Sequence, residues 1–186
     1  MPSRSSNLPA GRVPVIPPLR NNHAMAQDEA ISTLQGAAAI CREAGDRHGE
    51  GMALTKLGVA LVEVQRFEEA IAAHQGAAAI FRETGDRHRE AEALISLCST
   101  LQRVRRFEEA ISPLQGAAAI FREAGDRNGE GAALILLAFD YQEMREPGRA
   151  AAYWREAAAA MRDVGNHEVA AELEKRAAYA QPGQRP

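Results

Sequence analysis

Residues 35–40 read Gln-Gly-Ala-Ala-Ala-Ile, and this stretch decides the fold because the same six residues recur at 75–80 and at 115–120. The offset is 40 residues each time. A second run, Arg-Phe-Glu-Glu-Ala-Ile, stands at 66–71 and again at 106–111, and Gly-Asp-Arg begins at 45, 85 and 125. Self-similarity at a fixed period indicates a stacked array in which each unit contacts only its neighbours.

Each 40-residue unit contains two apolar stripes with the spacing of an α-helix. One stripe follows the i, i+3, i+4, i+7 pattern and predicts a helix from about 67 to 84. It consists of Phe67, Ala70, Ile71, His74, Ala77, Ala78 and Phe81. The other stripe precedes it, at Leu54, Leu57, Gly58 and Leu61. In each Gly-Asp-Arg triplet the glycine suits the left-handed residue that ends a helix, and the aspartate suits the N-cap of the next.

The alternation of large and small residues in these stripes resembles the tetratricopeptide repeat. The matching positions are Leu57, Gly58, Leu61, Ala70 and Ala77, then Leu97, Cys98, Leu101, Ala110 and Ala117, then Leu137, Ala138, Tyr141, Ala150 and Ala157. The usual family unit has 34 residues. The 40-residue unit is similar to the extended variety found in kinesin light chains and in signalling regulators of high-GC bacteria. This resemblance covers about residues 26–180 and implies an all-α solenoid, a right-handed superhelix of antiparallel helix pairs.

The same alignment divides the chain into segments. A half-repeat is expected at 26–45, complete repeats at 46–85, 86–125 and 126–165, and a polar capping helix at 166–180, which gives about eight helices. Residues 1–25 contain Pro9, Pro14, Pro17 and Pro18, which are incompatible with the expected first helix, so this segment is predicted to be extended or disordered. Residues 181–186 are predicted to be a disordered tail.

The composition of the chain argues against several classes of partner. The formal net charge is −3, so no overall basic field favours a nucleic acid or an anionic membrane surface. No apolar run approaches the roughly 20 residues that span a bilayer, and residues 1–22 lack the apolar stretch of a secretory signal. We therefore expect a cytoplasmic protein in which Cys41 and Cys98 are reduced packing residues.

The face opposite the core stripe on the first helix of each pair points into the concave groove that the resemblance implies. This face is mixed in character. Its residues are Met52, Lys56, Val59 and Glu63, then Glu92, Ser96, Ser99 and Arg103, then Ala132, Leu136, Phe139 and Glu143. Leu136 and Phe139, with Ile135 on the flank, are more apolar than a solvated face requires, and we predict that they anchor a partner's helix or peptide. The alternative is that the capping helix, or a neighbouring turn of the superhelix, covers them.

The second helices carry a stripe of small residues on their outward face. It includes Gly36, Gly76 and Gly116 together with Ala39, Ala79 and Ala119. A glycine inside a helix costs about 1 kcal/mol relative to alanine. Its threefold recurrence suggests that another helix packs closely here, as in a homodimer. The alternative is that recent duplication copied a neutral glycine three times.

The sequence predicts no catalytic residues, metal site or cofactor. His48 and His88 lie in first helical turns, without the i, i+4 partner that would place two ligands on one helix face. His74 replaces an apolar core residue, and a partly buried, hydrogen-bonded histidine is the favoured interpretation. We therefore predict a scaffold or adaptor that binds a peptide or helical partner in the groove. The alternatives are a self-associating structural module and an enzyme or small-molecule sensor with His74 at its polar centre.

Overall fold

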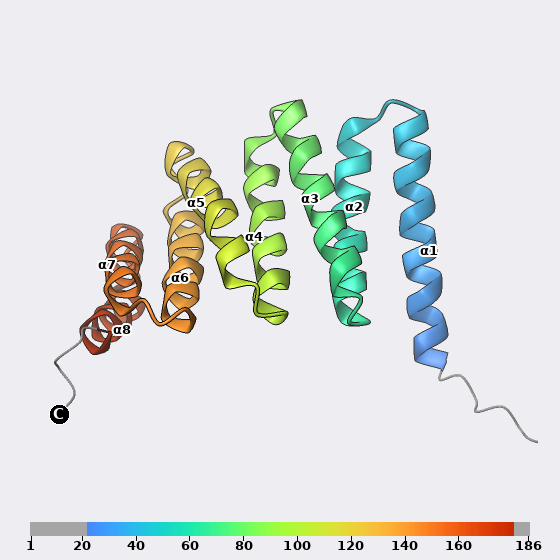
Figure 1. The fold of residues 1–186 in the computed structure, drawn as a ribbon. Coiled ribbons are helices and arrows are strands. Elements are labelled where there is room, and N and C mark those ends of the chain that lie inside the picture. Colours follow the sequence, from blue (N-terminus) through green and yellow to red (C-terminus); the bar gives the residue numbers. More distant parts are fainter. Residues whose placement is uncertain (1–21, 181–186) are drawn as a thin grey trace, which may run out of the picture.

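A computed structural model describes residues 22–180, and Figure 1 shows these residues as a row of helices in sequence order. Within this range the helices are α1 (Asn22–Glu43), α2 (Arg47–Glu63), α3 (Phe67–Thr84), α4 (Arg87–Arg103), α5 (Phe107–Glu123), α6 (Arg127–Glu143), α7 (Pro147–Asp163) and α8 (His167–Tyr179). Each helix packs against its neighbours in sequence, in antiparallel pairs. The predicted all-α solenoid is confirmed. No helix in the described part of the chain is both long and apolar enough to cross a membrane.

The helix ends follow the glycine and aspartate signals of the repeat. Gly45, Gly85 and Gly125 adopt φ values of 72°, 76° and 72°. The carboxylate of Asp46 accepts a hydrogen bond from the Gly49 amide at 2.8 Å, and the equivalent aspartates cap α4 and α6 in the same way. These caps satisfy amides that have no partner inside the helix. The expected helix from about 67 to 84 corresponds to α3.

One predicted boundary is wrong. Helix α1 begins at Asn22, four residues before the expected start of the half-repeat at residue 26. The reason is that the last proline of the N-terminal segment is Pro18, so residues 22–25 are free to continue the helix. The predictions of disorder for the rest of the N-terminal segment and for 181–186 lie outside the described residues.

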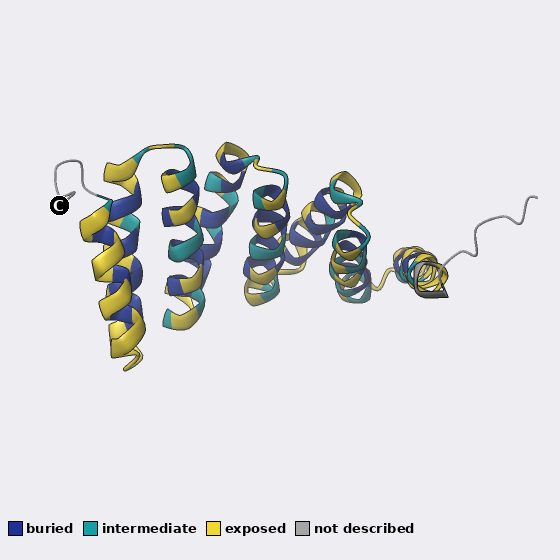
Figure 2. Cartoon of the chain, turned by 90° about the horizontal axis from the view of Figure 1, so that it is seen from below, coloured by how far each residue is buried: buried dark blue, intermediate teal, exposed yellow. Residues whose placement is uncertain are grey.

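The core lies between the helices, and the outer faces are exposed (Figure 2). The small residues of the repeat signature are buried most completely, because they allow adjacent helices to approach closely. Ala70, Ala77, Ala110 and Ala117 have no exposed surface, and Phe81 fills the space between α2 and α3. The predicted core stripe of α3 is buried from Ala70 to Phe81, whereas Phe67 at its start is half-buried.

A buried glutamate recurs at the start of α2, α4 and α6. Glu50, Glu90 and Glu130 are each 2% exposed. Glu90 accepts hydrogen bonds from Arg82 Nε at 2.7 Å and from Arg87 Nη1 at 2.5 Å, and the other two glutamates have equivalent arginine pairs. Burial acts to raise the pKa of Glu130, but its hydrogen bonds with the two arginines outweigh burial and leave this pKa below the usual value. The arginine side chains remain largely exposed, so only the carboxylate loses its contact with water.

Candidate partner-binding groove

We call the residues predicted to point into the groove the groove face, and helices α2, α4 and α6 carry all of them. None is fully buried. Lys56, Val59, Glu63, Ser99, Arg103 and Phe139 are exposed, and Met52, Ser96, Ile135 and Leu136 are half-buried. The half-buried apolar members pack their inner sides against the core, so each presents only one edge to a partner.

A hollow of about 520 Å³ lies at the N-terminal end of the groove face. It is lined by Gln27, Val62, Glu63, Gln65, Phe67 and Arg103. The structure thus brings two predicted groove residues, Glu63 and Arg103, to one place. Neither forms an ion pair with another described residue, which leaves a carboxylate and a guanidinium available to a ligand. Helical periodicity did not assign the other four to the groove. It placed Phe67 on the core stripe of α3, while Gln27 lies on α1, Val62 near the end of α2 and Gln65 in the turn that follows.

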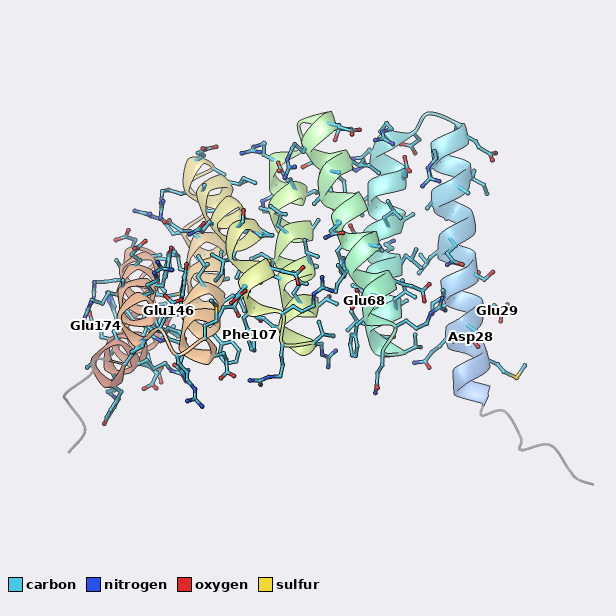
Figure 3. The ribbon with its side chains drawn as sticks, viewed as in Figure 1. Asp28, Glu29, Glu68, Phe107, Glu146 and Glu174 are labelled. Carbon is cyan, nitrogen blue, oxygen red and sulfur yellow. The ribbon has the colours of Figure 1, made fainter. Side chains whose placement is uncertain are left out.

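An aromatic pair lies at the C-terminal end of the groove face. The ring of Phe139 on α6 is 39% exposed and meets the ring of Phe107 edge-on, with 6.2 Å between the ring centroids. Phe107 begins α5 (Figure 3), and the guanidinium of Arg105 lies 5.2 Å from the centroid of its ring. Phe139 remains exposed with α8 in place, so the capping helix does not cover it. Leu136 and Ile135 beside it are half-buried.

Side chains of the same chain partly cover the small-residue stripe. Gly76 and Gly116 are half-buried, and a methyl group added at these positions would lie 3.3 Å from Leu54 Cδ1 and 3.7 Å from Leu94 Cδ1. Each of these two glycines therefore has a leucine of the same chain close to it. At Gly36 no atom lies within 4 Å of that position. Self-association through this stripe remains a prediction.

His74 is enclosed in the core. It is 1% exposed, and its Nδ1 atom has no hydrogen-bond partner, so the expectation of a satisfied histidine is wrong for this atom. The ring fills the space over Gly58, where an added methyl group would lie 2.4 Å from His74 Cε1. Burial lowers the pKa of His74. The side chain does not reach the groove face and offers no polar centre for a site there.

Replacing His74 with leucine is expected to stabilise the fold by about 1 kcal/mol at pH 7.5, because it removes a buried nitrogen that lacks a partner. The lowered pKa means that the native state holds the neutral ring, so wild-type stability falls as the pH drops below 6.5, while the His74→Leu variant lacks this loss. Urea unfolding at pH 7.5 and 5.5 measures both effects, with the exposed His167→Leu as control. An identical pH dependence in wild type and His74→Leu would contradict the interpretation.

The other reactive side chains considered from the sequence are a buried thiol and two histidines that lie against aromatic rings. Cys98 is fully buried, and burial raises the pKa of its thiol to about 12, which keeps it protonated at neutral pH. His48 and His88 each lie edge-on against a phenylalanine of the adjacent helix. Among residues 22–180, no three histidine, cysteine or acidic side chains are arranged to hold a metal ion.

Solved structures with the same helical arrangement include three proteins of low sequence identity. A putative kinesin light chain from Podosopora anserina with nearly identical TPR-like repeats is 19% identical, with a TM-score of 0.59, and the match covers 90% of this chain and 93% of that one. RapI in its apo form is 14% identical, with a TM-score of 0.54, over 86% of this chain and 63% of that one.

The third is a signal transduction ATPase with numerous domains from Pyrococcus horikoshii, which carries a tetratricopeptide repeat sensor. It is 18% identical, with a TM-score of 0.56, over 83% of this chain and 26% of that one. The chain therefore spans less than two thirds of both RapI and this ATPase. At these identities the likeness establishes the fold alone.

A comparison of the sequence with curated proteins found no match. Residues 51–115 match the tetratricopeptide repeat family. That range begins in α2 and ends in α5, and the 40-residue period continues the same helix pair on both sides of it. The match to the tetratricopeptide repeat family is therefore to this part of the chain, and the described helices on both sides of it continue the same arrangement.

Proposed function

We propose that this protein is a scaffold or adaptor that binds a peptide or a helical segment of another protein along the groove face. Tetratricopeptide arrays are generally protein-interaction modules and typically non-catalytic. The observation that carries the proposal is the exposed ring of Phe139, which is supported from behind by Phe107. A large aromatic residue held in one place by a second ring suits an anchor contact.

The groove face offers different contacts along its length. At the C-terminal end, Phe139 and Leu136 can accept an apolar side chain of the ligand. Towards the N-terminal end, Arg103 and Glu63 in the hollow can pair with charges on the same ligand. Such a division fits a ligand with an apolar anchor at one end and polar groups of both signs at the other, because charge pairs at the rim fix orientation more than affinity.

The proposal can be tested with peptides selected from a random display library on the purified wild-type protein. Leu136→Glu combined with Phe139→Glu is expected to weaken binding of a selected peptide by about 30-fold or more, the effect of losing a contact worth about 2 kcal/mol. Fluorescence anisotropy measures this change. Far-ultraviolet circular dichroism should be unaltered, because both side chains lie at the edge of the core.

Val164→Glu serves as the matched control, since it places the same charge on an exposed apolar residue at the end of α7. It is expected to leave peptide affinity unchanged. If the double variant binds selected peptides as tightly as the wild type does, the groove face is not the binding surface.

A further inference from the structure

Helix α1 lacks the neighbour that covers the same face of α3, α5 and α7. In the complete units this neighbour is the first helix of the pair, and α1 packs only against α2 in the described chain (Figure 1). Ile40 is consequently 68% exposed, whereas its equivalents Ile80 and Ile120 are 4% exposed. We call the uncovered face the bare stripe. It consists of Ala26, Ala30, Thr33, Ala37 and Ile40.

The complete units show what normally occupies such a face. In the second unit, α2 brings its backbone close to Ile80, and Leu54 lies over Gly76. Over Gly36 the equivalent space is open. The bare stripe is therefore an apolar surface of small residues, with room for an apolar side chain of an occupant at its centre.

We propose that residues 13–20 of the same chain pack along the bare stripe, antiparallel to α1, in the position that the first helix of a pair occupies in the complete units. This segment supplies apolar side chains at Val13, Val15, Ile16 and Leu19. Its prolines prevent a helix, but an extended chain is thinner than a helix and fits against a face of alanine and glycine.

The length of the segment matches the stripe. From Ala26 to Ile40 the helix rises about 21 Å, at roughly 1.5 Å per residue. An extended proline-rich chain advances about 3.1 Å per residue, so about seven residues cover this distance. If the chain turns back just before Asn22, Ile16 comes to lie near Thr33, and Val13 reaches Ile40.

Charge favours this occupant over a second copy of α1. Residues 1–21 contain Arg4, Arg12 and Arg20 and no acidic residue. Glu29 and Glu43 flank the bare stripe, and neither pairs with a cation among the described residues. Figure 3 shows Asp28 and Glu29 near the start of α1, where Arg20 would lie. Two α1 helices packed antiparallel would instead bring Glu29 of one copy beside Glu43 of the other, and like charges repel.

The test uses the full chain with Cys41 replaced by alanine and a nitroxide spin label on Gly11→Cys. Cys98 is buried and is not labelled. We expect stronger broadening of the amide signals of Ala37 and Ile40 than of Ala26, although Ala26 is nearer to the label in sequence. Broadening confined to the start of α1 would overturn the proposal.

Three further samples make the result specific. Val13→Asn combined with Ile16→Asn should abolish the broadening at Ile40, whereas Ser5→Asn combined with Ser6→Asn should preserve it. A mixture of labelled protein and unlabelled nitrogen-15 protein should show no broadening. If the mixture broadens Ala37 and Ile40, the occupant is a second copy and the proposal is wrong. None of these results depends on whether the groove face binds peptides.

Discussion

Replacing Asp140 with asparagine is expected to raise the free energy of unfolding by about 2 kcal/mol at pH 8. Asp140 lies on α6 and has no exposed surface. One of its oxygens accepts a hydrogen bond from Gln102 Nε2 at 2.6 Å, and the other, Oδ2, has no partner. Burial raises the pKa of Asp140 from 3.8 to about 6, and the nearby Glu143 adds to the increase.

The sign of the effect follows from this raised pKa. The native state binds the proton more tightly than the unfolded chain does, so the contribution of Asp140 to stability is complete below pH 3.8 and is lost as the pH rises through about 6. Asparagine keeps an acceptor for Gln102 and carries no charge at any pH. The advantage of the variant should therefore be large at pH 8 and small at pH 4.

Chemical denaturation at these two pH values, with wild type and variant measured together, gives the difference directly. Asp28→Asn is the control, because it makes the same substitution at an exposed carboxylate on α1. Equal destabilisation of the Asp140→Asn variant at both pH values would show that the carboxylate is structurally required.

Removing Arg82 and Arg87 together is expected to destabilise the array by about 3 kcal/mol. Both arginines donate to Glu90, whose carboxylate is almost completely buried. Without them a charged group remains in the interior with no partner. Replacing Glu90 itself with alanine should cost only about 1 kcal/mol, since the arginines are more than half exposed and remain hydrated.

A variant that lacks Arg82, Arg87 and Glu90 tests whether the cost comes from the unpaired buried carboxylate or from the sum of the lost contacts. When Glu90→Ala is added to Arg82→Ala and Arg87→Ala, stability should rise back to that of Glu90→Ala alone, because no buried charge is left. Guanidinium unfolding of the four proteins provides the comparison. If the triple variant is less stable than the arginine double variant, the buried carboxylate is not the origin of the cost.

Much of the fold could be predicted because the repeat shows the same local signals several times. A glycine followed by aspartate marks each junction, and the alanines at 70, 110 and 150 occupy one buried position. The proline-rich segment predicts a later start for α1 than the structure shows, because its prolines end before residue 22. The buried Glu50, Glu90 and Glu130 could not be found from hydrophobic periodicity, which assigns charged residues to the surface. The recurring arginines around them were the available signal.

The groove could be predicted only where helical periodicity determines which way a residue points. Leu136 and Phe139 lie on α6 and were identified in this way. Phe107, Gln65 and Gln27 were missed because their positions depend on how the helix ends meet. The sequence also could not show that His74 Nδ1 lacks a hydrogen-bond partner, because residue type alone does not reveal the hydrogen bonds of a buried ring.

The buried glutamates also contribute to the coupling between units. Each joins the second helix of one unit to the first helix of the next, as Arg42 on α1 does with Glu50 on α2. At the junction of α7 and α8 the equivalent residue is Ala170, and the exposed pair of Arg162 and Glu174 stands in its place. In a linear array, total stability is the sum of unit terms and nearest-neighbour terms. Helix α8 lacks this buried carboxylate contact, so we expect it to separate from the array more readily than the helices before it.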